Sequence, residues 1–228
     1  YVPAHVPALS IDEICSLAEM PYSKRAATVY RAFGVDLPTE RIEALMESAY
    51  GDQFDDERIC PITSLDENTH VLELWHGPTS AFKDMALQCL PRFFSASAEA
   101  LRKRGELDHD FLILVATSGD TGKAALEGFK NAEHVRIGVL FPDGGVSDIQ
   151  RKQMVTTTGD NVQVWGVRGN FDDAQTGVKA LFTDEAYLAE LAARGYLLSS
   201  ANSINWGRLA PQIAYYYSAY CDLAGAGK

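Results

Sequence analysis

One lysine, Lys83, lies at the start of a predicted helix within the segment HGPTSAFKDMALQ, residues 76–88. The dipole at this end of a helix disfavours a protonated amine, and burial beside Pro78 and Phe82 acts in the same direction. A neutral lysine amine is a nucleophile that forms an imine with an aldehyde. For a lone lysine, the commoner arrangement is a packed stem whose amine reaches water, so Lys83 needs support from elsewhere in the sequence.

A second polar loop, TSGDTG at residues 117–122, follows the apolar run FLILVA and precedes a predicted helix. Backbone N–H groups at a helix start favour an anion. The loop is not a Walker A motif, because Thr117 and Ala124 stand where that motif needs a glycine and a hydroxyl residue. It also lacks the glycine spacing of a dinucleotide-binding loop. The alternative is a tight strand–helix turn with Asp120 or Thr121 as the N-cap.

Together, the two loops indicate one cofactor. An imine-forming lysine and an anion-binding loop are what pyridoxal phosphate, a phosphorylated aldehyde, requires of a protein. The pair therefore favours a chemical role for Lys83 over the role of an ordinary surface charge.

The elements that must position these loops follow from the apolar pattern. From residue 111 onward, short apolar runs alternate with helical stretches, and the runs are 111–116, 135–141, 161–167 and 196–201. Helices are expected to begin near four residues: Gly122, Ser147, Phe171 and Asn205. This alternation predicts an α/β fold, a parallel sheet with helices on both faces.

The first part of the chain has a different pattern. Residues 1–68 predict helices, the first of them opened by a capping box of Ser10 and Glu13. Residues 70–75, HVLELW, predict the first strand. Ligands of open α/β sheets lie at the carboxyl ends of strands, which directs attention to the loops after 70–75 and 111–116.

Composition excludes several classes of partner. The net charge is −11, from 31 acidic and 20 basic residues, and such a surface repels nucleic acids and anionic membranes. The four cysteines are far apart, which indicates neither a metal site nor a disulfide framework and suits a reducing cytoplasm. No apolar run approaches the roughly 20 residues of a membrane span.

Four segments resemble one enzyme family, in that family's order. HGPTSAFKD resembles the cofactor-lysine segment of threonine synthases, which are pyridoxal-phosphate enzymes of the type II fold, and ATSGDTG is similar to their substrate loop. The stretches at 159–182 and 200–217 also resemble family segments. The resemblance covers nearly the whole chain.

The resemblance implies a role for particular residues. Lys83 would carry pyridoxal 5′-phosphate as an imine, and Asp120 would contact the cofactor or the substrate. The other substrate-binding residues that it implies are Ser118, Thr121, Asn202, Ser203, Asn205 and Arg208. The alternative for the group after residue 201 is an N-cap on the last helix with a surface arginine. His76 and Thr79 are candidates for orienting the lysine loop.

The implied reaction belongs to threonine biosynthesis. Threonine synthases convert O-phospho-L-homoserine and water into L-threonine and phosphate, and Lys83 would move protons at the substrate's Cα and Cβ. Two alternatives stay open. One is a threonine synthase-like phospho-lyase, and the other is a non-catalytic protein that retains the fold.

The resemblance also implies a division of the chain. Threonine synthases hold the cofactor phosphate with a Ser-Gly-Asn-Phe-Gly loop, and the Gly-Asn-Phe at 169–171 lies at a different helix start. We therefore expect an N-terminal and small-domain portion of such an enzyme: 1–83 and 205–228 from an incomplete large domain, and 84–204 as the small α/β domain. Such a portion is expected to be inactive alone and to self-associate through exposed large-domain surface.

Overall fold

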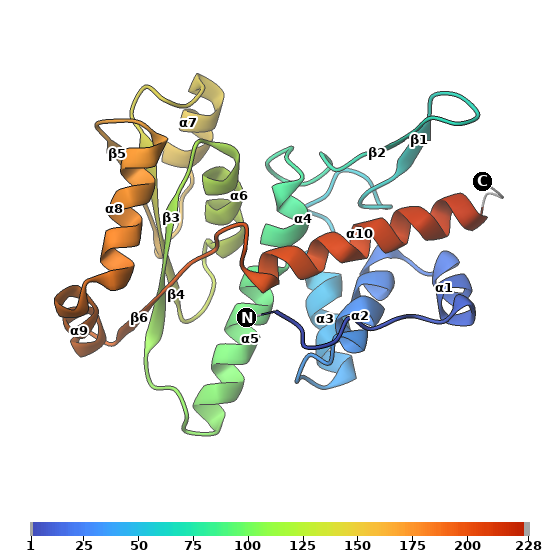
Figure 1. The fold of residues 1–228 in the computed structure, drawn as a ribbon, viewed down its shortest axis with the longest axis horizontal. Helices are drawn as coiled ribbons and strands as arrows, with labels where there is room; N and C mark the ends of the chain where they lie inside the picture. The colour runs from blue at the N-terminus through green and yellow to red at the C-terminus, as the bar shows by residue number, and fades with distance from the viewer. Residues whose placement is uncertain (1, 226–228) are drawn as a thin grey trace. The chain divides into compact units, whose positions relative to one another are not determined.

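The structure is a computed structural model that describes residues 2–225 (Figure 1). The chain forms two compact units. The first unit comprises the residues up to Cys89 together with those from Ile204 onward, and the second unit is Leu90–Ser203. These divisions lie near the predicted boundaries, and the assignment of the units to a large and a small domain stays a prediction.

The second unit contains the predicted parallel sheet. Its strands are β3 (Asp110–Ala116), β4 (Val135–Pro142), β5 (Val162–Val167) and β6 (Tyr196–Ser199). They pair in the order β5-β4-β3-β6, and every pair is parallel. The four apolar runs of the sequence are therefore the four strands, because a strand covered on both faces needs a nearly continuous apolar run.

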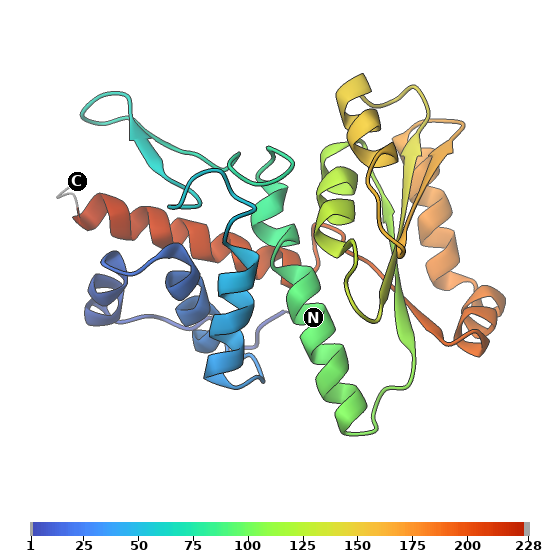
Figure 2. The same cartoon turned by 180° about the vertical axis from the view of Figure 1, so that it is seen from behind.

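Helices cover both faces of this sheet, as predicted. The second unit's helices are α5 (Leu90–Lys103), α6 (Asp120–Phe129), α7 (Asp148–Val155), α8 (Phe171–Thr183) and α9 (Glu185–Ala193). Helix α8 lies on one face, and α6 and α7 lie on the other (Figures 1 and 2). Capping boxes built on Ser147 and Asn170 open α7 and α8. Ile113, Phe129 and Val139 are completely buried in this core.

The first unit is mostly helical. Its helices are α1 (Ile11–Ala18), α2 (Tyr22–Ala32), α3 (Thr39–Ala49), α4 (Lys83–Leu87) and α10 (Trp206–Gly225). The predicted capping box is present, since Ser10 and Glu13 each bind the other's backbone N–H through the side chain. Helix α10 packs against α1, α2 and α4.

The expected strand at 70–75 is corrected by the structure. Only β2 (His70–Leu72) is extended in this region, and it pairs antiparallel with β1 (Ile62–Ser64) in a separate two-stranded ribbon. Opposite Glu73 stands Pro61, whose carbonyl accepts from the Glu73 N–H at 2.9 Å. Because proline has no N–H to return a bond, the ladder ends there. The loop that carries Lys83 therefore does not follow a strand of the parallel sheet.

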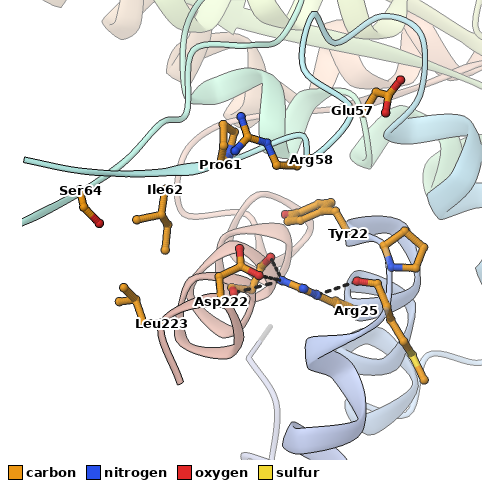
Figure 3. A pocket seen from close by; sticks show the side chains of 12 residues that line it. Tyr22, Arg25, Glu57, Arg58, Pro61, Ile62, Ser64, Asp222 and Leu223 are labelled. Carbon is orange, nitrogen blue, oxygen red and sulfur yellow. Dashed lines mark hydrogen bonds and ion pairs between the residues drawn. The ribbon is translucent and has the colours of Figure 1, made fainter. Parts of the chain in front are cut away.

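Arg25 of α2 ties three helical segments of the first unit together. Its side chain is 9% exposed. Carbonyl oxygens at the end of α1 and in the turn after it accept hydrogen bonds at 2.8–2.9 Å: Leu17, Ala18 and Met20. On α10, Arg25 donates to Ser218 Oγ at 2.8 Å and pairs with Asp222 at 2.6 Å (Figure 3). The planar, five-donor guanidinium suits this role because it reaches several acceptors at once.

Replacing Arg25 with methionine tests this role. Methionine keeps an apolar stem of similar length but removes every donor. We expect the free energy of unfolding to fall by about 2–4 kcal/mol, because the carbonyls lose charge-assisted partners while the surface-facing Asp222 regains water. Urea unfolding followed by circular dichroism measures the change. Arg31→Met is the matched control on the same helix, where the side chain is 41% exposed, and should cost less than about 1 kcal/mol. Equal losses for the two variants would contradict the assignment.

Candidate active site

Lys83 is the first residue of α4, as the sequence predicted, and its side chain is half-buried. Exposure alternates along the preceding turn: Gly77, Thr79 and Ala81 are buried, whereas Pro78 and Phe82 are exposed. The expectation that Pro78 and Phe82 bury the amine stays a prediction. Phe82 does contact the amine, with its ring centroid 4.2 Å from Nζ, a distance at which a ring face attracts an ammonium group.

The helix behind Lys83 is firmly anchored. The four residues after it in α4 are all buried, and Met85 and Leu87 have no exposed surface. Tyr50 Oη, at the end of α3, donates to the Met85 carbonyl at 2.7 Å. Lys83 thus lies on the rim of a buried, five-residue helix, where its amine is reachable but its backbone is fixed.

Thr79 and Asp84 hold the turn in front of the helix. Thr79 donates to the Asp84 carboxylate through both its N–H, at 2.8 Å, and its hydroxyl, at 2.7 Å. Thr79 was predicted to orient this loop, but Asp84 was missed. The available signal was an acidic residue followed by the largely apolar segment MALQCL.

The TSGDTG loop of the second unit is organised by Thr117. This residue is 2% exposed, and its Oγ1 accepts from the N–H groups of Gly119, at 3.0 Å, and Gly122, at 2.9 Å. Gly119 has φ +136°, a conformation that favours glycine. A Cβ on Gly122 would lie 2.4 Å from Thr117 Cγ2 and 2.9 Å from Val139 Cγ1, so only glycine lets α6 approach β4 this closely.

The candidate residues of this loop differ in exposure. Ser118 is exposed, and Asp120 and Thr121 are half-buried. Helix α6 begins at Asp120, and its N-cap is Gly119, which has no capping side chain. The alternative in which Asp120 or Thr121 serves as the N-cap is therefore wrong.

Asp120 is held by a residue that the sequence reasoning missed. Gln150 of α7 donates through Nε2 to Asp120 Oδ1 at 2.8 Å, and Lys123 Nζ lies 3.6 Å from the same oxygen. Gln150 also closes the capping box with Ser147. That capping-box spacing was visible in the sequence, but the contact with Asp120 spans 30 residues and had no local signal.

The second polar group falls on both sides of the division between the units. Asn202 and Ser203 belong to the second unit and are exposed. In the first unit, Asn205 Oδ1 accepts from the Gly207 N–H at 2.9 Å, so Asn205 caps the start of α10. Arg208 is 2% exposed, and this burial lowers the pKa of its guanidinium. The alternative reading of Arg208 as a surface arginine is therefore wrong.

Two candidate residues of the first unit are carried by neighbouring helices. Lys83 opens α4, Arg208 lies in the first turn of α10, and these helices pack together. A nucleophilic amine and a guanidinium on adjacent helices suit a substrate or cofactor that carries anionic groups.

A pocket of about 450 Å³ lies elsewhere in the first unit (Figure 3). Its described lining residues come from the turn before α2, from α2, α10 and β1, and from the loop before β1, and they include none of the predicted site residues. Two arginines of its wall are paired, Arg25 with Asp222 and Arg58 with Asp56 at 2.6 Å. Because the described lining contains no predicted site residue, we do not place the active site there.

His76 fastens the start of the lysine loop. Its Nε2 lies 2.7 Å from Glu73 Oε2, and its Nδ1 lies 2.5 Å from Asp55 Oδ1. Glu73 also accepts from Thr63 Oγ1 at 2.6 Å. The hydrogen bond to Glu73 is the largest influence on His76 and raises the pKa of its imidazole, and the Asp55 carboxylate adds to this effect against a smaller opposing effect of burial.

This contact predicts a dependence of stability on pH. A histidine whose pKa is raised on folding stabilises the fold fully below its unfolded pKa, near 6.5, and the contribution is lost as pH rises through the folded pKa. We expect the free energy of unfolding to fall by on the order of 0.5 kcal/mol as pH rises through the folded pKa of His76, which is the usual contribution of a partly exposed ion pair. Buried thiols such as Cys60, whose pKa is raised to about 12 by burial, lower stability at higher pH, so urea unfolding is compared at pH 6 and pH 8. The fall should be larger in the wild type and in His5→Gln than in His76→Gln, by about this amount. An unchanged pH dependence in His76→Gln would show that the two carboxylates do not stabilise the imidazolium.

Comparison with known proteins gives close relatives over the whole chain. The chain is 42% identical over 224 residues to threonine synthase of Pseudomonas aeruginosa, with 98% of this chain and 45% of that protein covered. It is 39% identical over 236 residues to human threonine synthase-like 1, with 100% of this chain and 31% of that protein covered. No protein-family model matches the chain.

Solved structures give the same result. The pyridoxal-phosphate-bound threonine synthase from Brucella melitensis superposes with a TM-score of 0.87 at 38% identity, over 100% of this chain and 47% of that one. Yeast threonine synthase superposes with a TM-score of 0.84 at 31% identity, over 96% of this chain and 43% of that one.

The chain spans less than half the length of these relatives. Within that span, the similarity covers both compact units. The described residues contain no helix long and apolar enough to cross a membrane. The parallel sheet, the helices around it and the identity of its relatives agree with the resemblance in the sequence, and the chain belongs to the threonine synthase family of pyridoxal-phosphate enzymes.

Proposed function

We propose that the protein carrying this sequence makes L-threonine and phosphate from O-phospho-L-homoserine and water, with pyridoxal phosphate bound covalently to Lys83. The observation that carries the proposal is the place of Lys83. It is a half-buried lysine at the start of an anchored helix, in a chain similar over its whole length to a pyridoxal-phosphate-bound threonine synthase. The chain covers less than half of that relative, so the complete reaction is proposed for the protein and not for this segment alone.

The residues present fit the aldehyde end of the cofactor. Lys83 supplies an amine on a fixed backbone, and two of the buried residues in the turn in front of it, Gly77 and Ala81, are small. When bound, the cofactor supplies an electron sink for a substrate carbanion. Lys83 would hold the cofactor and then accept and return protons at the substrate's Cα and Cβ.

The remaining candidates suit an anionic substrate. Arg208 presents a buried guanidinium, which is able to bind a phosphate or a carboxylate with two parallel hydrogen bonds. Ser118 and Thr121 offer hydroxyl donors on a loop whose backbone Thr117 already holds in place. Asp120 is oriented by Gln150 and is our candidate for contact with the substrate or the cofactor ring. We include Asn202 and Ser203 as substrate contacts, and Asn205 as the cap that places Arg208.

A second candidate function is elimination of phosphate without formation of threonine. The similarity to human threonine synthase-like 1 over 100% of this chain favours keeping this candidate. Product analysis with O-phospho-L-homoserine separates the two functions. Equimolar phosphate and threonine support the synthase, whereas phosphate without threonine supports the phospho-lyase.

We also propose that the 228-residue chain alone is inactive. A cradle for the cofactor phosphate of the form Ser-Gly-Asn-Phe-Gly does not occur in its sequence. Losing three charge-assisted hydrogen bonds, at about 1.5–3 kcal/mol each, weakens cofactor retention by at least about a thousandfold. Dialysis of the cofactor-loaded chain followed by a visible spectrum measures retention. Stoichiometric cofactor after dialysis, or phosphate release by the chain alone, would contradict this proposal.

Lys83→Ala, made in the protein that carries this sequence, tests the catalytic assignment. We expect threonine formation to fall by several orders of magnitude, because both the covalent link and the proton carrier are lost. The free energy of unfolding should change by less than about 1 kcal/mol, since the side chain packs little and alanine is a good helix former.

Lys130→Ala is the matched control for Lys83→Ala. Lys130 is an exposed lysine that follows α6 and pairs with Glu127. Its replacement should leave both threonine formation and stability near wild-type values. Appreciable threonine formation by Lys83→Ala would show that another group carries the reaction.

A further inference from the structure

Asp84 is the most deeply buried acidic group near the proposed active site. It follows Lys83 directly in the sequence and is 0% exposed. Burying a carboxylate costs free energy unless hydrogen bonds compensate it. A residue that merely favoured the helix dipole would face solvent at no such cost, so the burial of Asp84 calls for a specific role.

Two hydrogen bonds join the Asp84 carboxylate to a residue that precedes it in the chain, Thr79. Oδ2 accepts from the Thr79 N–H at 2.8 Å, and Oδ1 accepts from Thr79 Oγ1 at 2.7 Å. A helix cap would instead bind N–H groups inside the first turn, and α4 has no capping side chain at its N-cap, Phe82. The carboxylate therefore closes a loop of residues 79–84 and does not cap the helix.

The backbone within this loop is irregular. Ser80 has φ +54°, in the left-handed region that residues other than glycine rarely adopt, and its N–H donates to the Gly77 carbonyl at 3.0 Å. A Cβ on Gly77 would lie 2.5 Å from Asp84 Cβ and 2.7 Å from Oδ2. The turn therefore packs directly on the carboxylate, and only glycine fits at position 77.

A carboxylate is the group that binds these two donors most strongly. Thr79 offers an N–H and a hydroxyl, and both oxygens of an ionised carboxylate accept, whatever the rotation about its last bond. An asparagine of the same size has one accepting oxygen for the Thr79 N–H, and its NH₂ group would have to donate to the Thr79 hydroxyl, so two charge-assisted hydrogen bonds would become two neutral ones. The Asp84–Thr79 pair is thus sensitive to a change that alters neither volume nor shape.

We propose that Asp84 is the positioning residue for Lys83: its carboxylate, bound to Thr79, fixes the turn at 77–84 from which the lysine projects. The importance of this role for catalysis rests on the proposed function, but the geometry concerns only this chain. The same turn depends on three further residues: Gly77, Thr79 and the left-handed Ser80.

Two readouts that need neither cofactor nor substrate test the proposal. The first is hydrogen exchange at the Thr79 amide, and the second is the rate at which acetic anhydride acetylates Lys83, followed by peptide mass spectrometry. In Asp84→Asn, the Thr79 amide should exchange about tenfold faster, as expected when a charge-assisted hydrogen bond becomes a neutral one. The acetylation rate of Lys83 should change by a similar factor, whereas that of Lys130 stays constant.

Further variants separate positioning from general destabilisation. Thr79→Val, which removes the hydroxyl donor at constant shape, should reproduce the change in Lys83 acetylation, and Thr79→Ser should retain the wild-type rate. Asp66→Asn is the matched control, because Asp66 Oδ1 holds an exposed turn by accepting from the Asn68 and Thr69 N–H groups. It should leave Lys83 unaffected.

Two results would overturn the proposal. One is wild-type acetylation of Lys83 in a folded Thr79→Val or Asp84→Asn protein, and the other is an equal change in Asp66→Asn. Should the variants behave as expected while the protein does not form threonine, the positioning of Lys83 stands and the proposed function fails.

Discussion

A reactive lysine has to be reachable by a small molecule while the backbone beneath it stays fixed, and the Asp84–Thr79 contact is where this chain meets that requirement. The turn before Lys83 is irregular, because it contains a left-handed serine and no side-chain helix cap. A buried carboxylate takes both donors of Thr79 and packs against Gly77. These two hydrogen bonds offset part of the cost of burying that charge, so the stability of the turn depends on them.

The loop at 117–122 meets the same requirement with a neutral group. Thr117 Oγ1 accepts from the N–H groups of Gly119 and Gly122, so one buried side chain again takes two donors from an irregular stretch. Glycines again stand where the backbone approaches its support most closely. In both loops the residues that hold the backbone are buried, and the residues proposed to contact ligands, Lys83 and Ser118, are more exposed.

The sequence predicted the parts of the fold that depend on local pattern. Each strand of the parallel sheet is an apolar run bounded by polar turns. The starts of α7 and α8 carry capping boxes, whose two residues lie close together in the sequence. The early end of β2 was missed because the ladder ends at Pro61, which stands opposite Glu73, and a single run of residues does not show which residue it will face.

The candidate site was predictable to a similar extent. Lys83 could be proposed from its type, its neighbours and the resemblance, and its position at a helix start was correct. The groups that hold the site were not predictable, because their partners are distant or unexpected. Gln150 reaches Asp120 from another helix, and Asp84 turns back toward Thr79 inside the protein when its place in a first helical turn would favour solvent. Arg208 is likewise of a residue type that usually lies on the surface, but here it is buried.

The central claim is that Lys83, and no other lysine, forms the covalent link to pyridoxal phosphate. The most direct measurement is borohydride reduction of the protein after incubation with the cofactor, followed by protease digestion and mass mapping of the modified peptide. The account predicts the modification on the peptide that contains Lys83 and its loss in Lys83→Ala. Modification of Lys123 or Lys130, with Lys83 unmodified, would contradict the account.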